Sequence, residues 1–325
     1  MWPTPERPAF GRFVYDQVKA LRMTGGIKVE VATIDSGSVG AYVQAAHRLR
    51  RLFSARRFDV VHAHFGLSAW PALAIGGRVH AVTLHGTDLE HPRSRPITLA
   101  ALPLLDVVGV VSEELRGRVP VVAPVRARWR RGPGVQVLPC GVDSKRFREL
   151  NRRECREELG LKVDGRYVLF PADPARQEKR YDLARSLVGS SFGAGADLLA
   201  LGAVDPGQMP VWVNAADAVL VPSDRESFGL ATLEALACNV PVLATPHGVA
   251  VEALAGLEGT YCGQFSLEAW GRALARVLET EDPRVSGRTV AERYSAAAMA
   301  DRVAEAWRAA LARERGPARA SSSDD

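Results

Sequence analysis

Apolar runs rich in β-branched residues alternate with helical patterns along almost the whole chain. The runs are continuous rather than alternating, which is typical of parallel strands that are buried on both faces. In the first half we predict strands over residues 28–34, 59–64, 80–86, 106–112 and 135–141. In the second half we predict strands over residues 166–172, 197–203, 217–223, 241–246 and 259–262.

Amphipathic helical patterns separate these strands. They cover residues 41–53, 96–105, 179–187, 210–216, 228–237, 267–279 and 295–315. Strands that alternate with helices favour parallel sheets joined by right-handed crossovers. The polar, charge-dense stretch 143–165 separates two such blocks, so we predict an α/β protein with two Rossmann-like lobes. The predicted parts are a first lobe at 1–145, a second lobe at 146–294, a C-terminal helix at 295–315 that packs back toward the first lobe, and a disordered tail at 316–325.

The chain opens in a proline-rich loop, MWPTPERPAFGRF. A lobe of this kind normally opens with a buried strand that leads into its first loop. Either the first sheet lacks its opening strand, or the true start lies upstream. A missing central strand would leave backbone donors and acceptors unpaired, so we favour the second explanation.

Composition excludes several classes of protein. Hydrophobic residues make up 47% of the 325 residues and charged residues 24%, which excludes disorder as the main state. No apolar run approaches the roughly 18 residues of a membrane-spanning helix, and the N-terminus has no signal-peptide pattern. The cysteines are scattered without a CxxC pair, which argues against structural zinc and disulfides and favours a cytoplasmic location. They are Cys140, Cys155, Cys238 and Cys262.

The formal net charge is +5, and most of the cationic side chains are arginines. This excess is compatible with anionic small molecules, an anionic membrane face or nucleic acid. One basic cluster contains Arg126, Arg128, Trp129, Arg130 and Arg131. It suits an interfacial loop on an anionic membrane, and equally a solvated surface. No nucleic-acid-binding motif is present, so we predict no nucleic-acid partner.

The segment with the most chemical information is residues 221–248. A predicted strand runs into a polar loop with Glu226, and Phe228-Gly229-Leu230 then opens a helix whose N–H groups can bind an anion. Glu234 lies among apolar residues of that helix, where a carboxylate is costly unless a donor such as a ribose diol satisfies it. In the alternative reading, Ser223 and Glu226 form a capping box and Glu234 faces solvent or pairs with an arginine.

The Glu226-x7-Glu234 pattern, followed by CNVPVLATPHG, resembles the signature of family 4 retaining glycosyltransferases of the GT-B fold. Further matching segments fall in the family's order and cover most of residues 8–310. They are FGRFVYDQVKALRMTG, DVVHAHFGLSAWPAL, TLHGTDL, LPCGVDSKRF, FPADPARQEKRYDLA and NAADAVLVPSDRESFGLATLEALA. Within the family, the chain looks most like bacterial transferases of teichuronic-acid or surface-polysaccharide synthesis.

The resemblance implies that the second lobe binds a nucleotide-sugar donor. Glu226 would contact the donor sugar, Glu234 would accept from the ribose hydroxyls, and Arg176 and Lys179 would bind the diphosphate. Phe228, Gly229 and Leu230 would present backbone N–H groups and apolar contacts to the donor. For Arg176, whose position lacks the family's usual Gly-Arg pair, a solvated helix start is an equal alternative.

The first lobe would contribute the acceptor side. His85 resembles the family's active-site histidine, which hydrogen-bonds the donor sugar. We interpret Thr87 and Asp88 as turn or cap residues, His62 as buried and His64 as lining the cleft. Gly11 resembles the N-terminal glycine loop that approaches acceptor and phosphates, although only one of the usual two glycines is present. Gly141-Val142-Asp143 with Phe147 resembles the structural connection between the lobes.

The resemblance implies a retaining, front-face transfer of a hexose to a hydroxyl of a glycan, glycolipid or cell-surface polysaccharide. No DxD motif is placed to hold a metal on the diphosphate, so we expect a metal-independent enzyme without a cofactor. The departing phosphate would help to deprotonate the acceptor. Three alternatives remain at this point. The first is another GT-B enzyme of the nucleotide-sugar 2-epimerase type, and the second is a basic non-catalytic protein that binds nucleic acid or membranes. The third is a degenerate, poorly folded copy that lacks the opening strand.

Overall fold

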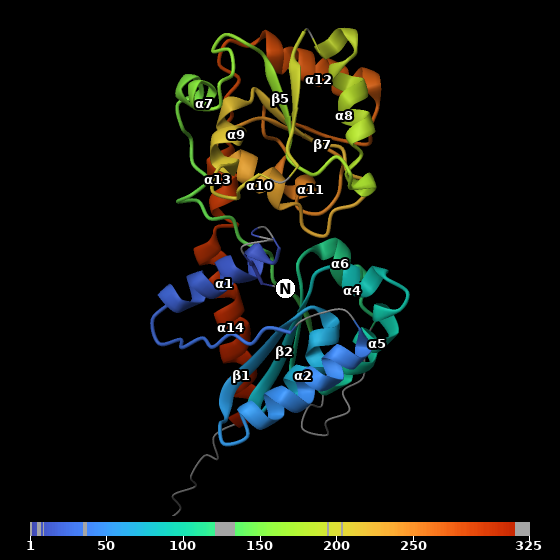
Figure 1. Cartoon of the computed structure of the whole chain (residues 1–325), viewed down its shortest axis with the longest axis vertical. Coiled ribbons are helices and arrows are strands. Elements are labelled where there is room, and N and C mark those ends of the chain that lie inside the picture. The colour runs from blue at the N-terminus through green and yellow to red at the C-terminus, as the bar shows by residue number, and fades with distance from the viewer. Residues whose placement is uncertain are drawn as a thin grey trace, which may run out of the picture. The chain divides into compact units, whose positions relative to one another are not determined.

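The computed structural model describes residues 2–4, 8, 10–34, 38–120, 134–193, 195–202 and 204–315 (Figure 1). The chain divides into two compact units. The first unit comprises residues 1–2, 18–139 and 300–325, and the second comprises 3–17 and 140–299. Each unit is built around its own parallel sheet, which confirms the prediction of two parallel α/β lobes.

The first unit contains a four-stranded parallel sheet in the order β1-β2-β3-β4. Each strand pairs with the next along the chain, so that Val60 lies beside Val79 and Ala81 beside Val107. The strands are β1 (Phe58–His64), β2 (Gly77–Leu84), β3 (Val107–Val110) and β4 (Val135–Val137). The helices are α1 (Arg12–Met23), which starts in the second unit, α2 (Val39–Leu52), α3 (Ala69–Leu73), α4 (Thr87–Glu90), α5 (Ser94–Ala101), α6 (Glu113–Arg118) and α14 (Ala296–Arg315), with short 3-10 turns at Gly66–Ser68 and Leu102–Leu104.

Helices cover both faces of this sheet (Figure 1). On one face, Leu21 of α1 and Val303 of α14 pack against Val79 and Val107 in a continuous apolar cluster. On the other face, α3 packs against β1 and β2 and against α2. The C-terminal helix α14 is therefore part of the core of the first unit.

The predicted strand at residues 28–34 is wrong. This segment is not part of the sheet, and among the described residues no strand precedes Phe58. Its carbonyls accept hydrogen bonds from arginine side chains instead: Arg22 Nη2 donates to Val29 O at 3.1 Å and Arg48 Nη2 to Thr33 O at 2.8 Å. A strand-like sequence forms a ladder only when a neighbouring strand supplies the partner groups, and β1 does not pair with this segment.

The second unit contains a five-stranded parallel sheet in the order β6-β5-β7-β8-β9. Every strand predicted in this half forms. The strands are β5 (Tyr167–Phe170), β6 (Asp197–Ala200), β7 (Ala218–Val221), β8 (Val242–Ala244) and β9 (Tyr261–Cys262). The helices are α7 (Arg152–Glu158), α8 (Tyr181–Val188), α9 (Met209–Ala215), α10 (Leu230–Ala237), α11 (Ala250–Ala253), α12 (Leu267–Glu279) and α13 (Gly287–Glu292), with 3-10 turns η3 (Gln177–Lys179) and η4 (Ser191–Gly193).

The second sheet is also covered on both faces. Trp270 and Leu274 of α12 and Leu187 of α8 pack against the apolar side chains of β5, β7 and β8, and Trp270 is fully buried. Helices α9 and α10 lie against the opposite face. This packing fixes the strand ends from which the loops of the candidate site extend.

The observed division of the chain differs from the predicted one at its margins. The units separate at Pro139–Cys140 and at Met299–Ala300, and residues 3–17 belong to the second unit although we had placed them in the first. The predicted tail at 316–325 and the basic cluster from Arg126 to Arg131 lie outside the described residues. Within the described residues, no helix is long and apolar enough to cross a membrane.

Candidate functional site

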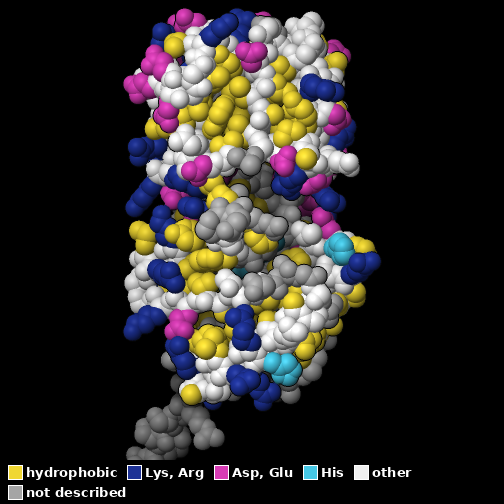
Figure 2. Space-filling view, in the orientation of Figure 1, with side chains coloured by type: hydrophobic (Ala, Val, Ile, Leu, Met, Phe, Trp, Pro, Cys, Tyr) yellow, Lys and Arg dark blue, Asp and Glu magenta, His cyan; other side chains and the backbone are white. Residues whose placement is uncertain are grey.

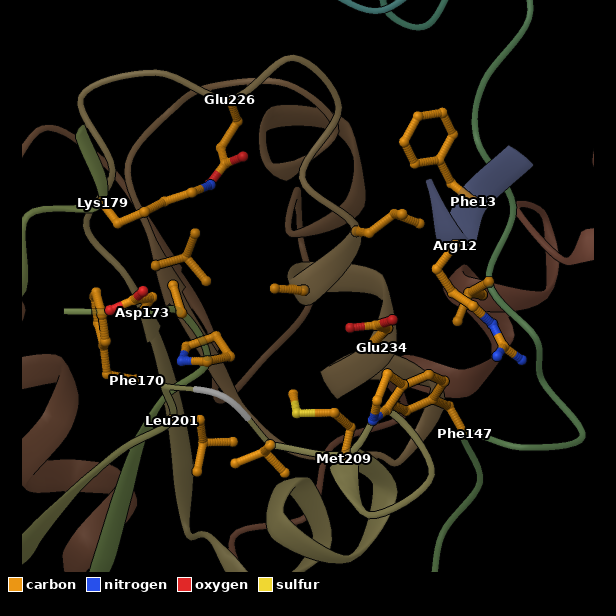
Figure 3. Close-up of a pocket in the computed structure, with 18 of the residues that line it drawn as sticks. Arg12, Phe13, Phe147, Phe170, Asp173, Lys179, Leu201, Met209, Glu226 and Glu234 are labelled. Atoms are coloured by element: carbon orange, nitrogen blue, oxygen red, sulfur yellow. The ribbon is translucent and has the colours of Figure 1, made fainter. Parts of the chain in front are cut away.

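The second unit contains a cavity of about 430 Å³ at the carboxyl ends of its central strands (Figure 3). β5 ends at Phe170 and β7 at Val221, and the loops that follow them border the cavity. Ligands of parallel α/β sheets bind beyond the carboxyl ends of the strands, because helix N-termini and loop backbones gather there. The volume is within the range of small-molecule sites.

Lys179 and Glu226 meet at one side of this cavity (Figure 3). Lys179 Nζ lies 2.6 Å from Glu226 Oε1, and the Ser223 hydroxyl donates to the same oxygen at 2.8 Å. Both charged side chains are largely buried, with 15% and 13% of their surface exposed. The loops after β5 and β7 therefore place a cation and a carboxylate in contact, where each can exchange its partner for a ligand group.

Helix α10 begins beside the cavity through a glycine turn. Gly229, immediately before the helix, has φ 90°, which few other residues tolerate. Behind it, the Phe228 carbonyl accepts from Val249 N at 2.7 Å, and a Cβ on Gly248 (φ 59°) would lie 2.4 Å from that carbonyl oxygen. Thr232 N already donates to Gly229 O at 3.1 Å. The N–H groups of Leu230 and Ala231 precede the first possible acceptor within the helix, so these two can face an anion.

Glu234, on the second turn of α10, points into the cavity (Figure 3). It is half-buried, and burial raises its pKa to about 7; the charge of Asp16 adds to the rise and Arg146 opposes it. No described residue hydrogen-bonds its carboxylate.

The alternative that Ser223 and Glu226 form a capping box is wrong. The Ser223 hydroxyl donates to Glu226 Oε1, and helix α10 starts only at Leu230.

The sequence did not reveal a group of charged residues that lines the cavity with Glu234. Arg12 Nε donates to Asp16 Oδ1 at 3.0 Å, and Arg146 Nη2 lies 3.7 Å from Asp16 Oδ2. Burial raises the pKa of Asp16. Within the described part of the chain, the buried Nε of Arg146 has no hydrogen-bond partner. No sequence pattern connects α1 with Arg146, so only the structure identifies this group.

Apolar side chains form another wall of the cavity, and they were also missed. Phe170, Leu201 and Met209 line it together with Phe147, and the Arg146 guanidinium lies 4.7 Å from the centre of the Phe147 ring (Figure 3). We had interpreted Phe147 as a structural connection only. These residues come from separate elements, and their hydrophobicity makes them look like ordinary core in the sequence.

The remaining predicted residues of the second unit take less central positions. Arg176 lines the cavity, but its side chain is 56% exposed, and Arg176 Nη2 donates to Glu178 Oε1 at 2.7 Å. Gly11 has φ 71°, and its carbonyl caps the start of α1 by accepting from Val14 N and Tyr15 N. Phe228 is buried under the turn, and Leu230 lines the cavity.

His85 belongs to the first unit, directly after β2. His64 Nδ1 lies 3.0 Å from His85 Nε2. The neighbouring His62 has a fixed tautomer when neutral: Trp307 Nε1 can only donate, and it reaches His62 Nδ1 at 2.9 Å, so His62 Nε2 carries the proton and donates to Thr83 Oγ1 at 2.8 Å. The three histidines thus form a stacked group at the ends of β1 and β2.

Burial keeps these histidines neutral. It lowers the pKa of His64 to about 4 and that of His85 well below its usual range, and the His64 charge further lowers the pKa of His85. Asp88 is fully buried and accepts from the backbone N–H groups of His85, Gly86 and Gly66. The prediction of Asp88 as a turn or cap residue is confirmed. His85 is therefore a rigidly held, neutral hydrogen-bonding group.

No group of three or more potential metal ligands occurs among the described residues. On the face shown in Figure 2, Lys and Arg side chains are interspersed with Asp and Glu side chains over the second unit. The predicted membrane contact of Arg126, Arg128, Trp129, Arg130 and Arg131 falls on residues that the structure does not describe, so it stays a prediction.

Two family models match this chain. Residues 10–146 match "Glycosyltransferase Family 4", and residues 187–306 match "Glycosyl transferases group 1". A D-inositol 3-phosphate glycosyltransferase of Actinosynnema mirum is 30% identical over 74% of this chain and 69% of its own length. TuaC of Bacillus subtilis, whose name places it in teichuronic acid biosynthesis, is 29% identical over 58% of this chain and 54% of its own length.

Solved structures share the fold. The Anabaena protein HepE, in complex with UDP and glucose, aligns with a TM-score of 0.68 and 14% identity over 94% of this chain and 97% of its own. At this identity the likeness concerns the fold alone. Sequence and fold agree, and together they show that this chain is a glycosyltransferase of family 4 with the GT-B fold.

Proposed function

We propose that this glycosyltransferase is a retaining, metal-independent enzyme that transfers a hexose from a nucleoside-diphosphate sugar to a hydroxyl group of a glycan or glycolipid. The observation that carries the proposal is the cavity of the second unit, which combines Lys179, the start of α10 and the inward-pointing Glu234. A cation, the N–H groups that open a helix and a carboxylate without a described hydrogen-bond donor match a diphosphate joined to a ribose.

The diphosphate would lie between Lys179 and the first turn of α10. A leaving nucleoside diphosphate gains negative charge in the transition state, and fixed cations and N–H groups directed at that charge lower the barrier. Arg176, at the margin of the cavity, can add its charge if it releases Glu178. These protein cations can do the work of a divalent ion, which supports metal independence.

Glu234 would accept hydrogen bonds from the ribose hydroxyls, because it needs donors and no described residue supplies one. The apolar wall of Phe170, Leu201 and Met209 would contact the base. Glu226 would turn from Lys179 to a hydroxyl of the donor sugar, which leaves Lys179 for the diphosphate. His85 stays a predicted donor contact, whose surroundings the structure gives within the first unit only.

The chemistry of the relatives supports the choice of substrates. HepE was solved with UDP and glucose, and the Actinosynnema relative is named as a D-inositol 3-phosphate glycosyltransferase. We infer a hexose donor from the first and a hydroxyl acceptor from the second. The retaining course, with the departing phosphate helping to deprotonate the acceptor, is inferred from the resemblance of the Glu226-x7-Glu234 pattern to the signature of retaining family 4 enzymes.

The test is titration calorimetry with UDP, GDP and ADP, followed by transfer assays with the sugar of the nucleotide that binds. Lys179→Ala and Glu226→Ala should abolish transfer without unfolding the protein, because each removes a group in contact with the donor. Lys162→Ala and Glu258→Ala, at exposed positions outside the cavity, are the matched controls and should retain activity. Full transfer by either cavity variant, or epimerisation of the donor sugar without an acceptor, would contradict the proposal.

A further inference from the structure

Arg180 has an unusual backbone conformation next to Lys179. It joins η3 to α8 with φ 56° and ψ 51°, in the left-handed region. Among the described residues, only Phe65 and Asn239 are further non-glycine residues with positive φ. An arginine is less stable in this conformation than a glycine would be, because its Cβ crowds the backbone. Its side chain must therefore contribute something that glycine cannot.

The Arg180 side chain connects two loops. Its Nε and Nη2 donate to Asp182 Oδ1 and Oδ2 at 2.9 and 2.8 Å, within its own turn. Its Nη1 donates to Asp224 Oδ1 at 2.8 Å, on the loop after β7. The backbone repeats this connection, since Asp224 N donates to Glu178 O at 2.9 Å. The planar guanidinium satisfies both carboxylates in one fixed geometry.

Lys179 and Glu226 join the same two loops, in the cavity. Adjacent residues of the first loop, Lys179 and Arg180, thus contact carboxylates two positions apart on the second, Glu226 and Asp224. The inner ion pair, Lys179 with Glu226, has to open when Lys179 binds a ligand. The outer ion pair, Arg180 with Asp224, lines a separate, open hollow on the surface. The outer pair can therefore persist while the inner pair exchanges partners.

We propose that Arg180 is a positioning residue that clamps the Lys179 loop to the Glu226 loop while Lys179 changes its partner from Glu226 to the diphosphate. This inference rests on the proposed function. Without the clamp, release of Glu226 leaves neither of the two ion pairs that join the loops, and Lys179 becomes less well positioned when the diphosphate binds. A loss of preorganisation of this kind weakens binding.

If Arg180 served only to stabilise the fold, the melting temperature and the nucleotide affinity of Arg180→Gly would change differently. Exposed ion pairs contribute little to stability, and the Arg180, Asp182 and Asp224 side chains are 33%, 60% and 55% exposed. Glycine at position 180 also removes the backbone strain. Arg180→Gly should therefore leave the melting temperature unchanged or higher, yet weaken binding of the nucleoside diphosphate by about fivefold. A stabilising residue would lower the melting temperature and leave the affinity of the folded protein unchanged.

The experiment compares Arg180→Gly, Asp224→Ala and Asp182→Ala. Asp224→Ala removes the acceptor on the second loop and should reproduce Arg180→Gly, whereas Asp182→Ala removes only the acceptors within the turn and is the matched control. We would measure calorimetric affinities for UDP, GDP and ADP, and amide hydrogen exchange in segments 174–180 and 222–227 of the nucleotide-free protein. For the variants at Arg180 and Asp224 we expect faster amide hydrogen exchange in both segments and weaker nucleotide binding. For the variant at Asp182 we expect neither change.

A double variant provides the second readout. If Arg180 acts through Lys179, Arg180→Gly in a Lys179→Ala background should not weaken nucleotide binding further. Additive losses, or unchanged exchange and affinity in Arg180→Gly and Asp224→Ala, would overturn the positioning role while leaving the proposed function intact. Failure of the wild-type protein to bind any of the three nucleotides would overturn the proposed function, and the positioning role with it.

Discussion

Glu234, which we propose as the acceptor for the ribose hydroxyls, lowers the stability of the empty protein. A half-buried carboxylate without a hydrogen-bond donor among the described residues is unfavourable in the empty protein, since burial disfavours its charged form. The same feature makes it a strong acceptor for a ligand that brings hydroxyl groups. Binding groups that destabilise the free protein are common at functional sites.

This balance predicts a pH-dependent effect of Glu234→Gln. The pKa of Glu234 is raised from 4.5 to about 7, so the folded protein holds a proton that the unfolded chain releases, and stability falls as pH rises between these values. The variant cannot ionise. It should be about 1 to 3 kcal/mol more stable than wild type at pH 8.5, with the difference vanishing below about pH 4.5.

Urea denaturation at pH 8.5 and pH 4.5 measures this difference, and Glu258→Gln, at an exposed site, is the control. We expect the same Glu234→Gln protein to bind nucleotide more weakly, since an amide is a poorer acceptor than a carboxylate. Equal stabilities of variant and wild type at high pH would show that Glu234 is well solvated in the folded protein.

At the scale of elements, the start of α10 depends on close backbone packing. Gly248 has φ 59°, and a Cβ there would lie 2.4 Å from Phe228 O, against the turn that opens the helix. Gly256 has a similar φ of 70°, but a Cβ there would meet nothing within 4 Å. The two glycines therefore separate the effect of backbone strain from the effect of a steric clash.

Gly256→Ala should cost about 1 kcal/mol, from strain alone. Gly248→Ala should cost about 2 to 4 kcal/mol, because the Phe228 carbonyl must also move, and it should lower nucleotide affinity by displacing the N–H groups of the first turn of α10. Chemical denaturation and calorimetry measure both effects. Equal losses of stability in the two variants would mean that this turn adjusts freely.

Helix α14 is fastened to the first sheet by a directed hydrogen bond as well as by apolar packing. Trp307 Nε1 donates to His62 Nδ1 at 2.9 Å in a partly buried site, whereas Trp70 Nε1 donates to Ile97 O at 3.1 Å at the surface. Trp307→Phe should lower the free energy of unfolding by about 1 to 2 kcal/mol more than Trp70→Phe, because it leaves the His62 nitrogen without this donor. Urea denaturation of both variants measures this difference in the free energy of unfolding. Similar losses of stability in the two variants would contradict a specific role of the hydrogen bond between Trp307 and His62.

At the scale of the whole molecule, local patterns predicted most of the fold. The runs around Val168 and Val219 form central strands because continuous β-branched sequences suit parallel strands that are covered on both faces. The run at residues 28–34 is also rich in β-branched residues and is not in the sheet, because strand formation also requires a partner. Local sequence does not reveal whether that partner is present.

The site was predictable only in part, for a similar reason. Lys179, Glu226 and Glu234 lie in segments whose order and spacing match a family, and the structure brings them to one cavity. Asp16 and Arg146 belong to no such pattern, and they meet Glu234 only through the folded arrangement of the second unit. Arg180 was overlooked because its significance lies in a backbone angle and in the partner Asp224, neither of which its residue type indicates.

The central claim is that the cavity of the second unit binds a nucleoside diphosphate through Lys179, the start of α10 and Glu234. The most direct measurement is a crystal structure of the protein with UDP, GDP or ADP, whichever binds most tightly by calorimetry. We predict density for the diphosphate at the first turn of α10 and for ribose hydroxyls within hydrogen-bond distance of Glu234. A nucleotide bound elsewhere, with the Glu234 carboxylate turned to bulk solvent, would contradict the account.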